Sequence, residues 1–280
     1  MTYGQLETKR ADIERIIERA HGRVGVAIID PEHGDTMLVL GHDHFPMQSV
    51  FKFPLALEIL HQIENGKYSL DQLIHIKESE LHSNTWSPLK KKYPSGDADI
   101  PLAEIIRVTV AESDNNGCDI LFRLAGGPAV VNEFIHTLGI ADISIVATEE
   151  AMHADASVQY RNWCTPLSAT QLLCAFFRQQ ILSAEHTNFL RTIMVNTATG
   201  AKRIKGKLPA DAVVAHKTGS SGADEKGIAA ATNDIGIITL PNGRSFMIAV
   251  FITNSSDDEN FRDSIIADIT KAAWDGLIHQ

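Results

Sequence analysis

The distribution of hydrophobic and polar positions along the chain predicts strands near both ends. Residues 24–29 form an unbroken apolar run, which is typical of a buried strand, and residues 36–40 supply its hairpin partner. Residues 233–240 and 245–253 predict a second pair of strands, joined by a Pro-Asn-Gly turn. The two pairs together predict an antiparallel sheet built from opposite ends of the sequence.

Helical periodicity accounts for most of the remaining chain. Residues 5–20 fit an amphipathic helix and residues 257–278 a closing helix, while residues from about 44 to 198 are mostly helical in pattern. The expected fold is therefore α+β, an α/β sandwich: an antiparallel sheet flanked by terminal helices, with an inserted all-helical domain. We expect residues 1–43 and 199–280 to form the sheet domain, with the active site in the groove beside the helical domain of residues 44–198.

Composition excludes several classes of function. A chain of 280 residues that is 44% hydrophobic can bury a substantial core. The formal net charge of -10 disfavours nucleic acid as a partner, and the basic run at residues 90–92 is interpreted as a solvated loop. No apolar stretch reaches the length of a transmembrane helix. These features favour a soluble enzyme.

The first candidate for chemistry is the Ser-Val-Phe-Lys run at residues 49–52, at the start of an apolar helix predicted from about Gln48. Residues three apart share a helix face, so Lys52 could take the proton of the Ser49 hydroxyl. Average composition gives roughly one S-x-x-K in a chain this long, so the motif alone more often marks a surface serine and lysine.

A second polar motif, Ser-Asp-Asn at residues 113–115, separates two apolar stretches. As structure it would be a loop or a helix cap, since all three residue types cap helices well. As chemistry, Ser113 offers a second hydroxyl that passes a proton to a leaving nitrogen, and Asn115 offers an amide that holds a substrate carbonyl. The pattern permits both interpretations.

A third motif, Lys-Thr-Gly, follows the short apolar run at residues 213–216, which predicts a strand. Lys217 and Thr218 would offer a cation and a hydroxyl to a carboxylate, and Gly219 would let a ligand approach the strand closely. The alternative is a polar strand end followed by a Gly-Ser turn.

The backbone N–H groups of Ser220 and Ser49 could complete an oxyanion hole if the first and third motifs meet in space. By composition alone, the ordered set of three motifs appears in roughly one chain per thousand of this length. The combination is therefore far more specific than any of its members.

In this order, the three motifs resemble those of the penicillin-recognising serine enzymes, most closely the class A serine beta-lactamases. The resemblance extends from the first helix to Trp274. It implies Ser49 as the acylated nucleophile and Lys52 as its base or proton relay. It also implies Ser113 as proton donor to the beta-lactam nitrogen, Asn115 as a contact to the substrate amide, and no cofactor.

The resemblance further implies a glutamate that holds the water which removes the acyl group from the serine. Glu149, in the polar stretch of residues 147–155, stands at the matching distance from Ser113, and Glu150 is the alternative. Without that context, two adjacent acids more often lie on a solvated surface. Whether the lysine or the glutamate serves acylation is disputed for the family.

Two departures from the commoner class A pattern resemble the PER-like extended-spectrum branch. His153 replaces an asparagine four residues after the glutamate, and Asp119 replaces one six residues after the serine of Ser-Asp-Asn. The resemblance implies a differently shaped omega loop and a wider cavity that admits bulky oxyimino-cephalosporins. The alternative is that His153 packs against the loop and Asp119 caps a helix.

A third departure concerns the cation for the substrate carboxylate, because residues 227–234 contain no arginine. Arg203 stands where the PER-like branch supplies a substitute, and a guanidinium grips a carboxylate with two parallel hydrogen bonds. Its alternative is a solvated basic loop. Trp86 resembles the aromatic residue at the mouth of the pocket, although a lone tryptophan more often serves packing.

The three cysteines, Cys118, Cys164 and Cys174, cannot all pair within one chain. Cys118 fits a buried helix thiol, and a bridge between Cys164 and Cys174 is left open. The histidines at residues 42–44 look like metal ligands, but the other ligands of a zinc hydrolase motif are missing, so no metal is expected.

The family acts outside the cytoplasm, whereas the polar N-terminus lacks the apolar segment of a signal peptide. We therefore expect a periplasmic or secreted monomer whose signal peptide has been removed, with Met1 introduced for expression. Two alternatives to a hydrolase are a penicillin-binding DD-peptidase and a non-hydrolytic beta-lactam sensor domain. Glu149 and the lack of a membrane segment favour the hydrolase.

Overall fold

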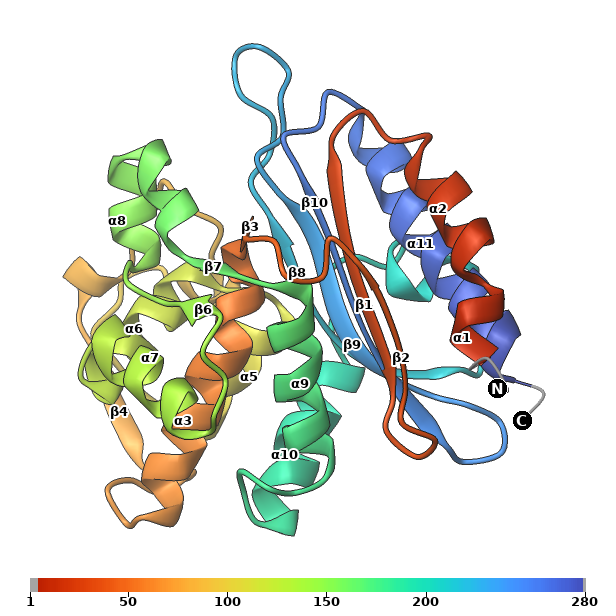
Figure 1. Ribbon diagram of the computed structural model, residues 1–280. Helices are drawn as coiled ribbons and strands as arrows, with labels where there is room; N and C mark the ends of the chain where they lie inside the picture. The colour runs from red at the N-terminus through yellow and green to blue at the C-terminus, as the bar shows by residue number, and fades with distance from the viewer. Residues whose placement is uncertain (1–4, 279–280) are drawn as a thin grey trace.

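A five-stranded antiparallel sheet lies at the centre of the computed structural model, which describes residues 5–278 (Figure 1). Met1 lies outside the described residues. The strands follow the order β2-β1-β10-β9-β8, so that strands from both ends of the sequence meet at its middle. Their bounds are β1 Arg23–Asp30, β2 Asp35–Val39, β8 Val213–Ser220, β9 Thr232–Thr239 and β10 Ser245–Thr253. The predicted α+β fold is confirmed.

Helices from the two ends of the chain cover the outer face of this sheet (Figure 1). They are α1 Gln5–Thr8, α2 Arg10–Ile17 and α11 Glu259–Leu277. The single helix predicted over residues 5–20 is wrong in detail, because it is interrupted at Lys9 and ends at Ile17. The Leu6 side chain in α1 is buried. The backbone N–H of Leu6 donates to Asp35 Oδ2 at 2.8 Å, and this bond joins α1 to β2.

The opposite face of the sheet packs against the helix-rich part of the molecule, to which α9 Pro166–Phe177 and α10 Ala184–Val195 belong. The other helices there are α3 Lys52–Glu64, α4 Pro88–Lys92, α5 Leu102–Ala111, α6 Asn115–Ala125, α7 Pro128–Thr137 and α8 Glu149–Ala154. Short 3-10 turns are η1 Gln48–Phe51, η2 Glu78–Glu80, η3 Ala156–Arg161 and η4 Ile204–Lys207. Helix α3 is buried on almost every side, which accounts for the large share of apolar residues in its sequence.

Two small sheets within the helix-rich part escape detection in the sequence because their strands are too short for a periodic pattern. One has the order β3-β7-β6, from Phe45–Pro46, Trp163–Cys164 and Ile143–Ser144. The other pairs β4 Leu73–Ile76 with β5 Ala98–Pro101. The first small sheet fixes the segment that leads into η1.

Two hydrophobic cores lie on the two faces of the large sheet. One extends from the sheet through the helix-rich part, around residues such as Phe51, Phe122 and Phe251. The second lies under the terminal helices, around residues such as Ile248 and Trp274. Within the described residues, no helix has both the length and the apolar character needed to span a membrane.

One expectation about local structure is corrected, and one question that the sequence left open is answered. The lysines at residues 90–92 end helix α4, rather than lying in a loop, and Ser87 caps that helix by accepting from Lys90 N. Cys164 and Cys174 form no bridge, since all three cysteines are free and buried. Burial raises the pKa of the Cys174 thiol to about 11 and raises that of Cys118 and Cys164 as well.

Candidate active site

The Ser49 hydroxyl stands at the start of a helix that two neighbouring strands hold in place. Strand β3 pairs with β7 through Phe45 and Cys164, and Asn233 of β9 donates from Nδ2 to the Met47 carbonyl at 3.1 Å. Gln48, immediately before the serine, adopts a left-handed φ of 47°. These contacts hold Ser49 in the 3-10 turn η1, one turn before the buried Lys52.

Lys52 gathers the polar groups of the first two motifs. Its Nζ donates to Ser49 Oγ at 2.9 Å, to the Ser113 carbonyl at 2.9 Å and to Asn115 Oδ1 at 2.6 Å. It also lies 2.8 Å from Glu149 Oε1. Because the ammonium is fully buried, these oxygens replace the water that it would otherwise bind. The arrangement provides a short proton path between the serine and the glutamate.

Ser113 lies in a turn between α5 and α6, with a left-handed φ of 59°. Asp114 caps α6 by accepting from Gly117 N at 2.8 Å, and it also accepts from Leu89 N at 2.6 Å. The motif therefore forms both a loop and a helix cap. It also directs the Ser113 hydroxyl towards Lys217 of β8, and Lys217 Nζ donates to Ser113 Oγ at 3.0 Å.

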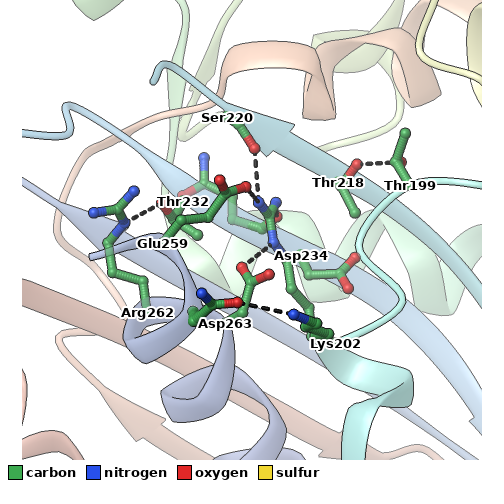
Figure 2. A network of polar contacts seen from close by, with 12 residues as sticks. Thr199, Lys202, Thr218, Ser220, Thr232, Asp234, Glu259, Arg262 and Asp263 are labelled. Atoms are coloured by element: carbon green, nitrogen blue, oxygen red, sulfur yellow. Dashed lines mark hydrogen bonds and ion pairs between the residues drawn. The ribbon is translucent and has the colours of Figure 1, made fainter. Parts of the chain in front are cut away.

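Lys217 and Thr218 lie within strand β8, which runs to Ser220 rather than ending before the motif. Burial, followed by the nearby Lys52 charge, holds the pKa of Lys217 well below its usual value. Thr218 Oγ1 lies 2.6 Å from Thr199 Oγ1, and this hydrogen bond is one of the dashed lines in Figure 2. The Lys217 amino group and two hydroxyl groups therefore lie together at this edge of the sheet.

Gly219 lines the main cavity and also has a packing role that was not predicted. A Cβ at this position would lie 2.4 Å from the Met47 carbonyl oxygen, so the segment before Ser49 is a close neighbour of the strand. The missing side chain lets β8 approach the serine. The glycine in the sequence indicated that another group approaches the strand closely, but it did not indicate that the Met47 carbonyl is such a group.

Glu149 is the first residue of the short helix α8, and its position is fixed from outside that helix. The carboxylate of Asp119 accepts from the N–H groups of Glu149 and Glu150, each at 2.8 Å. Glu149 Oε1 lies 3.4 Å from Ser49 Oγ. Glu150 is exposed and does not line the main cavity, so the structure brings Glu149, not Glu150, to the serine.

Asn162 was missed by the sequence analysis, although it organises the loop that carries Glu149. Its fully buried side chain accepts from Val146 N at 2.8 Å and from Ala147 N at 3.0 Å, and donates to the Ala147 carbonyl at 2.8 Å. These bonds join the two ends of the loop. An asparagine in a polar stretch carries no sequence signal for such a long-range role.

Arg203 is buried, with 4% of its side chain exposed, and is not part of a solvated loop. Its Nε donates to Asp263 Oδ1 of α11 at 2.7 Å, and Nη2 donates to Ser220 Oγ at 2.8 Å. Nη1 donates to the Asn233 carbonyl at 3.0 Å. The guanidinium thus faces the end of β8, beside Thr218 and Ser220, where a carboxylate could bind.

The site residues surround a cavity of about 680 Å³. It is bounded by Ser49, Ser113, Asn115, Glu149, Thr218, Ser220 and Arg203, with Trp86 and His153 on the side of the helix-rich part. Trp86 is 54% exposed and its Nε1 donates to the Glu112 carbonyl at 2.8 Å, while His153 Nε2 lies 2.8 Å from Asn84 Nδ2. In the described part of the chain, no cluster of three or more metal-binding side chains occurs.

A comparison with protein families decides the identity: the model of the beta-lactamase enzyme family matches residues 8–277. The chain belongs to this family. It is 44% identical to the beta-lactamase VEB-1 of Pseudomonas aeruginosa, over 99% of this chain and 92% of the relative. It is 40% identical to the extended-spectrum beta-lactamase PER-1 of the same species, over 98% of this chain and 88% of the relative.

Solved structures agree with the family assignment. The fold matches that of the TLA-3 extended-spectrum beta-lactamase with a TM-score of 0.96 and 49% identity, over 97% of this chain and 99% of that chain. A class A beta-lactamase from Bacteroides cellulosilyticus matches with a TM-score of 0.95 and 38% identity, over the full length of both chains. The protein is a class A serine beta-lactamase, so the DD-peptidase and sensor alternatives are set aside.

Proposed function

We propose that the beta-lactamase opens its substrate through an acyl-enzyme on Ser49. The Lys52 ammonium, which donates to Ser49 Oγ at 2.9 Å, first passes a proton to Glu149, 2.8 Å away, and the neutral amine then takes the serine proton as the nucleophile attacks the beta-lactam carbonyl; in the alternative route Glu149 takes the serine proton itself. The N–H groups of Ser49 and Ser220 stabilise the developing oxyanion. Ser113, linked to Lys217, delivers a proton to the leaving nitrogen, and Asn115 binds the substrate amide.

Glu149 completes the cycle by activating the water that releases the acyl group. The observation that carries this proposal is the position of its carboxylate, 3.4 Å from Ser49 Oγ and 2.8 Å from Lys52 Nζ. A base so close to the acylated oxygen can hold a water against the ester carbon. Asp119 supports this role by fixing the start of α8.

We propose penicillins and cephalosporins as substrates, including bulky oxyimino-cephalosporins, so that the enzyme confers resistance to them. The substrate carboxylate binds at Thr218, Ser220 and Arg203. His153 and Trp86 border the opposite side of the 680 Å³ cavity, which leaves room for a large acyl side chain. The extended-spectrum relatives PER-1 and TLA-3 support this range.

The cavity is lined by residues of both expected parts of the chain, 44–198 and 199–280. This supports the proposed division into a helical domain and a discontinuous sheet domain of residues 1–43 and 199–280. We propose that the mature enzyme acts as a monomer in the periplasm or outside the cell, where beta-lactams meet their targets.

The experiment that tests the mechanism is the release of a chromogenic cephalosporin product by wild type and the Glu149→Gln variant. We expect many turnovers per Ser49 in wild type. The variant should give a single stoichiometric burst and a mass increase equal to one acyl group, because acylation survives and water attack does not. The Ser49→Ala variant should show neither burst nor label. Normal turnover by Glu149→Gln would remove Glu149 from the mechanism and leave Glu150 as the next residue to test.

A further inference from the structure

The carboxylate-binding end of the cavity contains an acidic side chain that the proposed cycle does not use. Glu259, in the first turn of α11, lines the main cavity and is 72% exposed. Its Oε1 stands 3.9 Å from Arg203 Nη2. Figure 2 shows Glu259 and Asp263 of α11 in one polar network with Ser220. An exposed carboxylate beside an anion-binding arginine opposes the binding of an anion.

The charges around Arg203 strengthen this effect. Asp263, bonded to Arg203 Nε at 2.7 Å and 11% exposed, already balances the guanidinium. Glu259 therefore leaves the group of three with one net negative charge before any substrate enters. A bound substrate carboxylate adds a second, so a positive charge on the substrate itself would relieve the repulsion.

Space for such a positive group exists directly beyond Arg203. A second cavity of about 470 Å³ shares Arg203, Ser220 and Glu259 with the main one and extends between α11 and the loop after β8. A ring substituent next to a carboxylate bound at Arg203 would have this second cavity within reach, because Arg203 lines both cavities. The charged groups of this second cavity, besides Arg203 and Glu259, are Asp257, Asp258 and Arg262.

Those three charges are engaged within the protein. Arg262 donates from Nε to Thr232 Oγ1 at 2.7 Å and from Nη1 to the Asp257 carbonyl, and Asp258 caps α11 by accepting from Phe261 N at 2.9 Å. The Asp257 carboxylate accepts from His21 N at 2.7 Å. Glu259, by contrast, faces Arg203 across 3.9 Å, is exposed and lines both cavities.

From this geometry we infer that Glu259 is a specificity-determining residue, which favours beta-lactams whose ring substituent next to the carboxylate is cationic. The inference rests on the proposed binding of the carboxylate at Arg203. Glu259 attracts the substituent as the carboxylate docks, and it disfavours substrates that bring only negative charge to this end of the cavity. The effect belongs to capture of the substrate, so it should appear in KM more than in kcat.

The test compares two cephalosporins with the same acyl side chain, one with a quaternary ammonium group on the substituent next to the carboxylate and one with a neutral ester there. Values of kcat/KM are measured for wild type, Glu259→Gln and Glu225→Gln. The control residue Glu225 is exposed in the loop after β8 and lines neither cavity, so its variant makes the same change in net charge.

We expect Glu259→Gln to lower kcat/KM for the cationic substrate by about threefold to tenfold, as for one charge pair close to the surface. The value for the neutral substrate should stay level or rise, Glu225→Gln should behave as wild type, and high salt should shrink the difference. An equal loss of kcat/KM on both substrates would show that Glu259 only holds Arg203 in place, and it would overturn the inference. An unchanged kcat/KM on both substrates would overturn it as well. If wild type turned over neither cephalosporin, the proposed function itself would fall.

Discussion

Two residues beside the reacting groups hold backbone conformations that L-amino acids rarely adopt. Gln48 precedes the nucleophile with φ 47°, and Ser113 itself has φ 59°. Such conformations cost of order 1–3 kcal/mol each and persist only where surrounding contacts impose them. Here the contacts are the bonds from Asn233 to the Met47 carbonyl and from Lys52 to the Ser113 carbonyl. Both serines are therefore oriented before a substrate arrives.

Asp119 gives a prediction about pH that follows from its burial. Burial raises the pKa of this carboxyl from 3.8 to about 6, against the opposing effect of the two N–H groups that it accepts from. The folded protein therefore holds the proton more tightly than the unfolded chain. The contribution of the carboxyl to stability is largest below about pH 4 and declines as pH rises to about 6.

Thermal melts of wild type and Asp119→Asn between pH 4 and pH 8 test this. The melting temperature of wild type minus that of the variant should fall from about pH 4 to about pH 6 and stay level above it, since only wild type titrates at this site. The exposed Asp211 gives a control, Asp211→Asn, which should show no such trend. A difference that rises with pH over this range would contradict the assignment.

At the scale of elements, the sequence predicted the parts with long, regular patterns. The strands at residues 24–29, 233–240 and 245–253 match β1, β9 and β10 within one or two residues, because each is a long segment, mostly apolar in β1 and β10, that is buried in the sheet. The two-residue strands of the small sheet were not predicted. Their position depends on pairing with distant segments, such as Phe45 with Cys164.

The candidate site was predicted from motifs, and what could not be predicted was the contacts that hold the motifs in place. The close approach of Gly219 to Met47, the bond from Arg203 to Asp263 and the loop contacts of Asn162 each join residues far apart in the chain. Periodicity and propensity describe neighbours along the sequence, so they contain no information about such pairs.

The loop that carries Glu149 gives a prediction about a whole element. Asn162→Ala would leave the N–H groups of Val146 and Ala147 without their partner, at a cost of about 2–3 kcal/mol of unfolding free energy. We expect kcat to fall by at least about tenfold, with acyl-enzyme accumulating during turnover, because a displaced Glu149 fails in the water attack.

Denaturant unfolding and quenched mass spectrometry measure the two effects. Asn188→Ala, at an exposed position of α10, is the control and should leave both quantities near those of wild type. If Asn162→Ala lost stability yet kept normal kcat without acyl-enzyme accumulation, the loop contacts would matter for folding alone.

At the scale of the whole molecule, the buried thiols predict that the stability of the enzyme does not depend on redox conditions. Cys118, Cys164 and Cys174 are unpaired, and burial raises the pKa of each, which suppresses the reactive thiolate. We expect the melting temperature to be the same with and without a reductant. A thiol reagent at pH 8 should label no cysteine in the native enzyme and all three after denaturation. Rapid native labelling would contradict the buried positions.

The separation of the two cores bears on how this enzyme can evolve. Among the described residues, no member of the core under α2 and α11 lines the substrate cavity. Substitutions that widen the cavity under selection by a new antibiotic usually cost stability. Better packing on the far side of the sheet can compensate for that loss without touching the chemistry. Because the core under α2 and α11 is separate from the cavity, the enzyme can change its antibiotic range by substitutions in one place and restore its stability by substitutions in the other.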